Sequence, residues 1–400
     1  MVKHLFKMIW NKKKQNALLI SEMLISFMVL FAVFTLLVFD YQNYQKPMGF
    51  EYENVWVVNY SNPVNIRNAD SLKLFYETLK QTVKALPQVK EISYSSNNFP
   101  FSNSTSQSGF TYGKIHIDHI NWYHAGDSYM DVLNVNLNEG RWFSKEDIVS
   151  KNRPVVINAA LKEMIFGNES AIGKLIGSDW RDPSVKDKDK MRVIGVVRDM
   201  KMKGDYANPG VAVYNRVDTG EYRWLNSMLV SVTPGAGAAF EEKLYKTLAN
   251  AMSNSNIEIE HLADKRVKAN YFSVVPIIVM LIVAGFLVCN VALGLFGVLW
   301  YNINKRRGEI GLRRAVGASG KSVTWQLIGE AMVVATFSLI VGSFFAIQFP
   351  LLNVFDLSSN TYFIALALSI VFIYLLVLVC ALYPGRQAAG IYPAVALHED

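Results

Sequence analysis

Residues 315–322 form a near-match to a nucleotide-binding motif. Their sequence, AVGASGKS, matches the phosphate-binding P-loop except that Ala315 replaces the first glycine. A P-loop follows a buried strand of an α/β domain, whereas this segment follows a basic stretch and leads directly into a long apolar run. We therefore predict an ordinary joint between two helices, in which Gly317 or Gly320 ends the first helix. A second near-match, GNESAIGKL at residues 167–175, fails on spacing and has Leu in place of Ser or Thr.

The histidines do not form a recognisable zinc pattern. His116, His119 and His124 are the one cluster, and neither a cysteine nor a paired acid stands near them at ligand spacing. We interpret this segment as a water-exposed surface. No Gly-x-Ser-x-Gly elbow or other catalytic signature is present in the sequence. The sequence therefore predicts a non-catalytic chain without a metal site or a cofactor site of its own.

Two carboxylates interrupt apolar runs that are long enough to be membrane helices. Glu22 lies in the run 17–39 and Glu330 in the run 323–349, each about two helical turns from its basic end. A charge inside a bilayer is costly, and such residues often serve an ion or substrate pathway. Because both side chains can reach the membrane interface, we interpret them first as helix-contact residues. A role in transport is the alternative.

The stretch 305–322, KRRGEIGLRRAVGASGKS, predicts a charged helix between two apolar runs. Glu309 precedes Arg313 by four residues, which is the favourable order for an ion pair on a helix, and Arg306 extends the same stripe. Another face carries the apolar side chains of Leu312, Ala315 and Val316. The pattern predicts one side for a charged partner and one side that can be buried. The alternative is an interfacial helix whose basic residues only set the membrane topology.

These residues lie in or beside four apolar runs that predict membrane-spanning helices. Hydrophobic residues make up 51% of the chain and charged residues 18%, which is more apolar than an ordinary soluble domain. A helical run of this kind reaches roughly 35 Å, enough to cross a hydrocarbon core of about 30 Å. We predict spans at residues 17–39, 272–300, 323–349 and 362–383.

The basic residues predict the orientation of these spans, because Lys and Arg are retained on the cytoplasmic side. They gather before the first span and in the link 301–322, whereas the outer loop 350–361 has none. Both termini are therefore expected in the cytoplasm, residues 1–16 as an amphipathic helix and residues 384–400 as a tail. Much of the net charge of +7 belongs to this pattern, so membrane lipid, and not nucleic acid, is the expected partner.

The outward region 40–271 is predicted to be an α+β domain inserted between the first and second spans. Both cysteines lie in apolar runs, so this domain is expected to fold without a disulfide. A strand–helix–strand order at residues 54–95 recurs at residues 226–262, and the two units bracket an insertion at residues 97–223. Further elements are predicted within the insertion, at residues 155–158 (strand), 159–166 (helix) and 192–197 (strand).

The charged link and its surroundings resemble the FtsX-like permeases of the MacB type, which are subunits of ABC transporters. The resemblance rests on KRRGEIGLRRAVGAS at residues 305–319, with Glu330 in the following span. It continues after the last span with YPGRQAA at residues 383–389 and PAVAL at residues 393–397. In the outward domain, NEGRWF at residues 138–143 is similar to the family as well, and the match covers most of the chain.

The resemblance implies an inner-membrane permease half with a large periplasmic domain, working as a dimer with an identical or different second half. It also implies a cytoplasmic ABC ATPase that binds ATP and Mg²⁺ and docks on the helix between the second and third spans. The residues carried over to this coupling helix are Glu309, Ile310, Gly311, Arg313, Arg314, Gly317 and Ala318. Because only 16 residues precede the first span, the ATPase is expected to be another polypeptide.

Three functions within this family fit the sequence. The leading hypothesis is export or efflux, in which ATP hydrolysis moves the periplasmic domain and a periplasmic adaptor and an outer-membrane channel complete the pathway. The second is transmembrane signalling of the FtsX kind, in which the same motion activates an external enzyme. The third is release of lipoproteins from the membrane.

Overall fold

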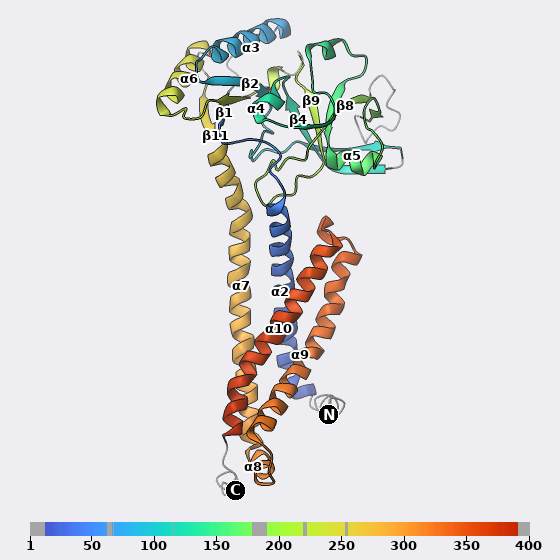
Figure 1. The fold of residues 1–400 in the computed structure, drawn as a ribbon, viewed down its shortest axis with the longest axis vertical. Helices are drawn as coiled ribbons and strands as arrows, with labels where there is room; N and C mark the ends of the chain where they lie inside the picture. The colour runs from blue at the N-terminus through green and yellow to red at the C-terminus, as the bar shows by residue number, and fades with distance from the viewer. Residues whose placement is uncertain are drawn as a thin grey trace. The chain divides into compact units, whose positions relative to one another are not determined.

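The computed structural model describes residues 13–61, 66, 68–113, 115–177, 190–218, 222–252 and 255–390, which fold as two compact units (Figure 1). One unit, the helical domain, comprises residues up to Gln42 together with those from Val274 onward. The other, the sheet domain, comprises Asn43–Ser273.

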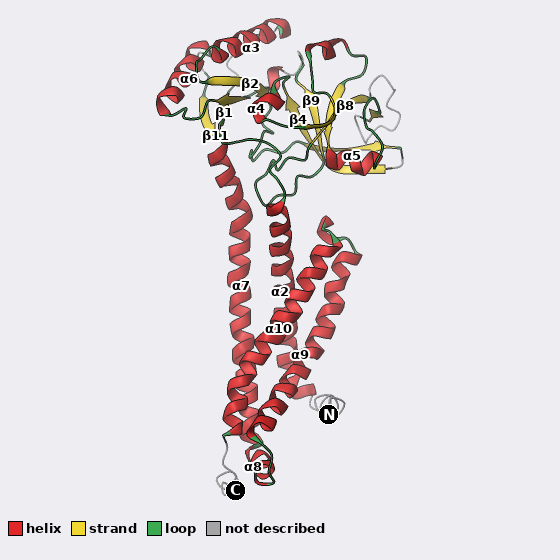
Figure 2. Ribbon diagram, in the orientation of Figure 1, coloured by secondary structure: helices red, strands yellow, loops and turns green. Residues whose placement is uncertain are grey.

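The helical domain is built on four long helices, each apolar and long enough to cross a membrane (Figure 2). They are α2 (Lys13–Gln45), α7 (Leu262–Lys305), α9 (Gly320–Leu351) and α10 (Ser359–Ala389). The short helix α8 (Arg307–Ala315) lies between α7 and α9, and a 3-10 turn, η4 (Val354–Asp356), precedes α10. Four spans with an α+β domain between the first and the second were predicted from the sequence, and this fold is confirmed.

The helices extend beyond the apolar runs from which the spans were predicted. α7 begins at Leu262, and α10 continues to Ala389 through residues that were expected to form a tail. The apolar run marks the part of a helix suited to lipid, whereas the hydrogen-bond ladder continues into polar sequence. The helix predicted at residues 1–16 lies outside the described residues except for the start of α2, and residues 391–400 lie outside them as well.

Close packing of small residues joins α2 to α9 in the helical domain. A Cβ atom at Gly342 would lie 2.4 Å from the Phe27 ring, so glycine is what lets the two helices approach. Nearby, Ser338 Oγ donates a hydrogen bond of 3.1 Å to the main-chain oxygen of Ile20. α7 is covered least, because only 6% of its most apolar window is buried.

One half of the sheet domain interleaves the two predicted strand–helix–strand units. The first unit is β1 (Val55–Tyr60), α3 (Ala69–Lys84) and β2 (Val89–Ser95), and the second is β10 (Ser227–Val232), α6 (Ala238–Ala251) and β11 (Ile257–His261). The strand order is β11-β1-β10-β2 and every neighbouring pair is antiparallel, which is a ferredoxin-like arrangement. Trp56 and Val58 pack in the core with α3 and α6, whereas Val57 packs in the core of the opposite face.

The insertion supplies the other half of the same sheet. Its strands run in the order β4-β9-β6-β8-β5, with β3 on β4 and β7 on β8, and Ser95–Ala125 is the pair that joins β2 to β4. Its strands are β3 (Gln107–Tyr112), β4 (Ile115–Ala125), β5 (Leu137–Gly140), β6 (Pro154–Asn158), β7 (Leu175–Ile176), β8 (Met191–Val197) and β9 (Ala212–Arg216). Its helical elements are α4 (Tyr129–Leu133), η1 (Lys145–Val149), α5 (Ala159–Phe166) and η3 (Tyr222–Trp224).

The histidine segment is a strand of this half. It was interpreted as a water-exposed surface, but it forms β4, whose Ile117, Ile120 and Tyr123 are buried. His116 keeps to the surface, where its ring pairs with Asp118 at 3.0 Å. Five polar residues are interspersed among the six apolar ones of β4, and its buried positions do not alternate strictly, so the period-two pattern from which a strand is predicted is weak.

Candidate functional site

The helix α8 is closed at its C-terminal end by a glycine with left-handed backbone. Gly317 has φ +101°, its N–H donates to Arg314 O at 3.2 Å, and the Ala318 N–H donates to Arg313 O at 3.0 Å. This pair of hydrogen bonds is the Schellman pattern of helix termination. Ser319 then caps α9 by accepting a hydrogen bond of 3.2 Å from Ser322 N. The P-loop look-alike is therefore the helix joint that was predicted, with an α-helix and not a strand before it.

Five side chains form a closed ring of hydrogen bonds, which we name the polar ring. Its members are Arg306 at the start of α8, Glu309 and Arg313 within α8, and Gln326 and Glu330 of α9. Arg306 donates to Glu309 at 2.9 Å, and Arg313 donates to the same carboxylate. Arg313 also donates to Gln326 at 2.7 Å, and Gln326 donates to Glu330 at 3.2 Å. Arg306 closes the ring with hydrogen bonds of 3.0 and 3.2 Å to the two oxygens of Glu330.

The two sides of the polar ring differ in exposure. The side chains of Arg306 and Glu330 are 19% and 15% exposed, whereas those of Arg313 and Glu309 are 45% and 43% exposed. The hydrogen bond to Glu309 raises the pKa of the Arg306 guanidinium above its ordinary value, and the charge of Glu330 adds to this effect. Ion pairs are stronger where water is excluded, so the inner pair Arg306–Glu330 holds α8 to α9 more firmly than the outer pair does.

The predicted pair Glu309–Arg313 is confirmed, but the predicted buried face of α8 is wrong. Ile310 and Gly311 are the buried residues, and Ile310 packs in a small apolar cluster with Ile303, Val323, Leu327 and Ala388. Leu312 and Val316 are 54% and 82% exposed. Spacing alone shows which residues share a face of a helix, whereas the polar ring fixes which face turns toward α9. An exposed apolar pair consequently remains on the surface of α8.

The remaining predicted site residues fall into two groups. Arg314 and Ala318 belong to the end of α8, where Arg314 Nη1 donates to Ala318 O at 3.2 Å. Glu22 lies apart from the polar ring, on α2. A Cβ atom at Gly294 of α7 would lie 2.7 Å from its Oε2, so the carboxylate packs directly against the α7 backbone. This contact favours the helix-contact interpretation of Glu22 over a transport role.

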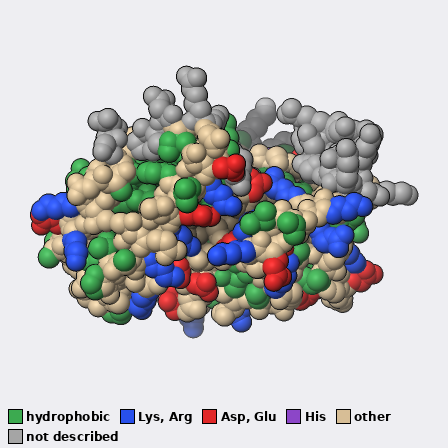
Figure 3. All heavy atoms as spheres, turned by 90° about the horizontal axis from the view of Figure 1, so that it is seen from above, with side chains coloured by type: hydrophobic (Ala, Val, Ile, Leu, Met, Phe, Trp, Pro, Cys, Tyr) green, Lys and Arg blue, Asp and Glu red, His purple; other side chains and the backbone are tan. Residues whose placement is uncertain are grey.

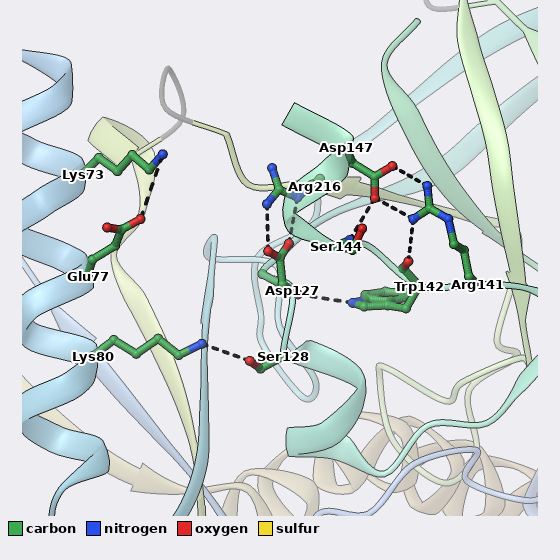
Figure 4. A network of polar contacts seen from close by, with 11 residues as sticks. Lys73, Glu77, Lys80, Asp127, Ser128, Arg141, Trp142, Ser144, Asp147 and Arg216 are labelled. Atoms are coloured by element: carbon green, nitrogen blue, oxygen red, sulfur yellow. Dashed lines mark hydrogen bonds and ion pairs between the residues drawn. The ribbon is translucent and has the colours of Figure 1, made fainter. Parts of the chain in front are cut away.

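A cleft in the sheet domain was not predicted from the sequence. It has a volume of about 1120 Å³ and is lined by α3, η1 and the ends of β4 and β9. Arg216 forms two hydrogen bonds of 2.7 Å with Asp127, and Arg141 pairs with Asp147 at 2.6 and 2.7 Å (Figure 4). The hydrogen bonds from Arg141 hold the pKa of the Asp147 carboxyl below its ordinary value.

The charged side chains that line this cleft are of both signs. Lys80 of α3 donates to Ser128 Oγ at 3.0 Å, which links the two halves of the sheet domain. Figure 3 shows positive and negative side chains interspersed over one face of the protein, not gathered by sign. The lining segments are far apart in the sequence, so no local pattern could have predicted the cleft. The acidic and basic side chains of the cleft pair with one another, which indicates a structural role. The polar ring at α8 is therefore the better candidate for a functional site.

Two family models together match nearly the whole chain. The MacB-like periplasmic core domain matches residues 17–245, and the FtsX-like permease C-terminal region matches residues 277–393. The second match contains α8, α9 and therefore the complete polar ring.

Relatives of the chain are ABC transporter proteins. The chain is 26% identical over 248 residues to the macrolide export ATP-binding/permease protein MacB of Aggregatibacter actinomycetemcomitans, covering 60% of this chain and 37% of that protein. It is 22% identical over 339 residues to the uncharacterized ABC transporter permease YvrN of Bacillus subtilis, covering 80% of this chain and 79% of that one. The chain thus spans between a third and a half of the length of the MacB proteins that it matches.

Among solved structures, the periplasmic region of MacB from Actinobacillus actinomycetemcomitans is similar to this chain, with a TM-score of 0.39 and 20% identity. The similarity covers 57% of this chain and 98% of that one. The extracellular domain of the ABC-type transporter YknZ is similar with a TM-score of 0.35 and 18% identity, covering 51% of this chain and 100% of that domain.

Proposed function

The chain belongs to the FtsX-like, MacB-type family of ABC transporter permeases, and from this premise we propose that it couples ATP hydrolysis by a separate ATPase to motion of its sheet domain. The polar ring is the observation that carries the proposal, because it ties α8 to a membrane span through paired charges. Transport or efflux of a substrate is the function that this motion would serve. The sheet domain would then lie in the periplasm of an inner-membrane protein whose two termini are cytoplasmic.

The exposed surface of α8 supports docking of the ATPase at this helix. Leu312 and Val316 are exposed apolar side chains on a short helix, and the outer pair Glu309–Arg313 lies beside them with nearly half of each side chain exposed. A surface that combines apolar anchors with a charged rim is typical of protein interfaces. Gly317 and Ala318 would set the end of the docking helix, and Arg314 would hold that end in place.

The connections of α8 to the helices on both sides of it support transmission of movement from the docking surface to the membrane spans. Arg306 directly follows the end of α7, and its pairing with Glu330 attaches the same residue to α9. A displacement of α8 would therefore act on two spans together. α7 runs from Lys305 back to Leu262, immediately after β11, as one helix of about 66 Å.

Two further partners belong to the proposal. YvrN, which is named as a permease and of which the chain covers 79%, supports an ATPase on another polypeptide. The poor coverage of α7 supports a second permease half, since a large apolar surface is left for lipid or another copy. A periplasmic adaptor and an outer-membrane channel would complete an export pathway, and ATP and Mg²⁺ would bind to the ATPase.

The proposal is tested with the ABC ATPase that copurifies with the tagged full-length chain, reconstituted with it in nanodiscs. We expect Glu309→Ala/Arg313→Ala to weaken ATPase binding and to uncouple hydrolysis, and Leu312→Ser/Val316→Ser to weaken binding. The matched control is Glu242→Ala/Lys246→Ala, which removes an exposed pair of the same spacing from α6. Unchanged ATPase binding and unchanged stimulation of hydrolysis in the α8 variants would refute the docking assignment.

A further inference from the structure

One loop of the sheet domain contacts the ends of both α2 and α7. Residues 198–211, which we name the anchoring loop, connect β8 to β9. Lys201 of this loop is only 2% exposed, and its ammonium donates to the main-chain oxygen of Tyr44 at 3.2 Å and to that of Asp205 at 3.0 Å. The Tyr206 ring stacks on the Tyr44 ring, with 5.7 Å between centroids. Tyr44 lies in the last turn of α2, so the loop holds the end of that helix.

The same loop is bound to the first turns of α7. Asp205 is 6% exposed and accepts two hydrogen bonds of 2.8 Å from the Arg266 guanidinium. Asn270, one turn further along α7, donates to Asp205 Oδ2 at 2.7 Å and accepts from Asp205 N at 2.8 Å. Gly204 has φ +116°, and a Cβ atom there would lie 2.7 Å from Asn270 Oδ1. The close approach of loop and helix therefore requires glycine at this position.

The other side of the anchoring loop is attached to the insertion half of the sheet. Asp199 Oδ1 accepts hydrogen bonds from Asn158 Nδ2 at 2.7 Å and from Ala160 N at 2.9 Å, at the start of α5. Asn158 in turn donates to Gly210 O at 2.8 Å and accepts from Ala212 N at 2.8 Å, where the loop ends. The loop is thus fastened at both of its ends to β6 and α5.

The two halves of the sheet domain are connected to α7 in different ways. The half containing β11 continues directly into α7 along the chain. The insertion half meets that first half in the sheet at the pair Ser95–Ala125. Outside the sheet, Lys80 of α3 is bonded to Ser128, and the apolar side chains of α4 pack in one core with Val57 of β1 and Leu229 of β10. To these connections between the two halves, the anchoring loop adds a direct attachment of the insertion half to α2 and α7, through a buried lysine and a paired, largely buried carboxylate.

We propose that the anchoring loop carries displacement of α2 and α7 into the insertion half of the sheet domain, with Lys201 and Asp205 as positioning residues. This inference rests on the proposed function, in which the membrane helices move. The loop makes the insertion half follow the helix ends directly, and without it the insertion half follows them only through its connections to the first half of the sheet domain.

The mechanical part of the proposal is tested on the full-length chain alone. Spin labels replace Val267 on α7 and Met164 on α5, both exposed, after Cys289 and Cys380 are changed to Ser. We expect a narrow distance distribution between the labels that broadens in Asp205→Asn. A distribution that stays narrow in this variant would overturn the proposal.

The matched control is Asp127→Asn, which breaks an Arg216–Asp127 pair of similar geometry that does not touch α2 or α7. We expect it to leave the distribution narrow, and equal broadening in both variants would overturn the proposal because it would reflect general loosening. Arg266→Lys, which keeps the charge and loses the paired geometry, replaces Asp205→Asn if that variant does not fold.

The functional part is tested in the complex with the copurifying ATPase. Labels at Leu74 on α3 and at Met164 report the separation of the two halves of the sheet domain. We expect ATP to shift this separation in the unsubstituted chain and in Asp127→Asn, and the shift to be lost in Asp205→Asn. A shift that persists in Asp205→Asn overturns the inference about the loop. No shift in the unsubstituted chain overturns the proposed function, and the measurement on the chain alone still decides whether the loop anchors the insertion half.

Discussion

The Arg306 guanidinium donates hydrogen bonds of 3.0 and 3.2 Å to both carboxylate oxygens of Glu330. Arg306 stands at the N-cap position of α8, and Glu330 lies two turns or more inside α9, a helix long and apolar enough to span a membrane. A carboxylate at this depth is costly unless it is paired. The pair therefore explains the acid in the span, and it makes the position of α8 depend on that of α9.

Removing the charge of Glu330 should destabilise the helical domain. We expect Glu330→Gln to lower the free energy of unfolding by about 1–3 kcal/mol, because Arg306 loses a charged acceptor in a site with little exposure. Thermal unfolding of the detergent-solubilised chain measures the change. Glu309→Gln is the control, and its effect should stay below about 1 kcal/mol because the side chain is more exposed. Equal losses in the two variants would contradict the order of strength assigned to the inner and outer pairs.

A side chain at Gly317 should disturb the end of α8. With φ at +101°, Gly317→Ala places a Cβ in the left-handed region and should cost about 1–2 kcal/mol. We expect reduced ATPase binding, because the joint that positions α8 is strained. Gly297→Ala is a suitable control, since it lies within α7 and a Cβ there meets no atom of the described residues within 4 Å. Full binding by Gly317→Ala would show that the end of α8 does not matter for docking.

Enlarging Gly342 should separate α2 from α9. The added methyl of Gly342→Ala would lie 2.4 and 2.7 Å from two atoms of the Phe27 ring, so a buried aromatic side chain has to move. We expect a loss of about 1–3 kcal/mol, as for other overpacked cores, measured by thermal unfolding in detergent. The control Gly285→Ala, where the new Cβ meets no atom within 4 Å in the part of the chain that the structure describes, should not lower stability. An unaltered unfolding temperature in Gly342→Ala would contradict the packing of these helices.

The pair Arg141–Asp147 should make stability depend on pH in the acid range. Because the folded-state pKa of Asp147 is lowered, its ionised form stabilises the fold above the unfolded-state pKa of about 3.9, and this contribution is lost as pH falls through the folded-state pKa. Asp147→Asn should therefore be less stable than the unsubstituted chain at pH 7. The difference should shrink below about pH 4. Thermal unfolding of both chains at pH 7 and below about pH 4 measures this, and a difference in stability that is the same at the two pH values would exclude the pair as its source.

Local patterns predicted the parts of the fold that depend on local physics. Apolar runs predicted the four spans, and the spacing of Glu309 and Arg313 predicted their ion pair. The interleaving of the two strand–helix–strand units was not predicted, because strand order depends on pairings between β1 and β10, which lie far apart in the sequence. The strand β4 was missed for a different reason, since its buried residues do not alternate strictly and polar residues stand between them.

The candidate site was predicted only in part, for a similar reason. The sequence placed Glu330 in a span and Arg306 on the stripe of α8, yet nothing local indicated that they meet. The buried face of α8 was predicted wrongly, because the rotation of a short helix is decided by its contacts with α9. The anchoring loop and the cleft join segments distant in the sequence, so tertiary structure alone brings their charges together.

A double-mutant cycle on Arg306 and Glu330 tests the central claim most directly. Arg306→Ala, Glu330→Ala and the double variant are reconstituted with the copurifying ATPase, and both ATPase binding and the stimulation of ATP hydrolysis are measured. If the pair transmits force, each single variant loses about tenfold in stimulation while ATPase binding is retained, and the double variant is no worse than the single ones. Full stimulation in the single variants, or losses that simply multiply in the double variant, would contradict coupling through this pair.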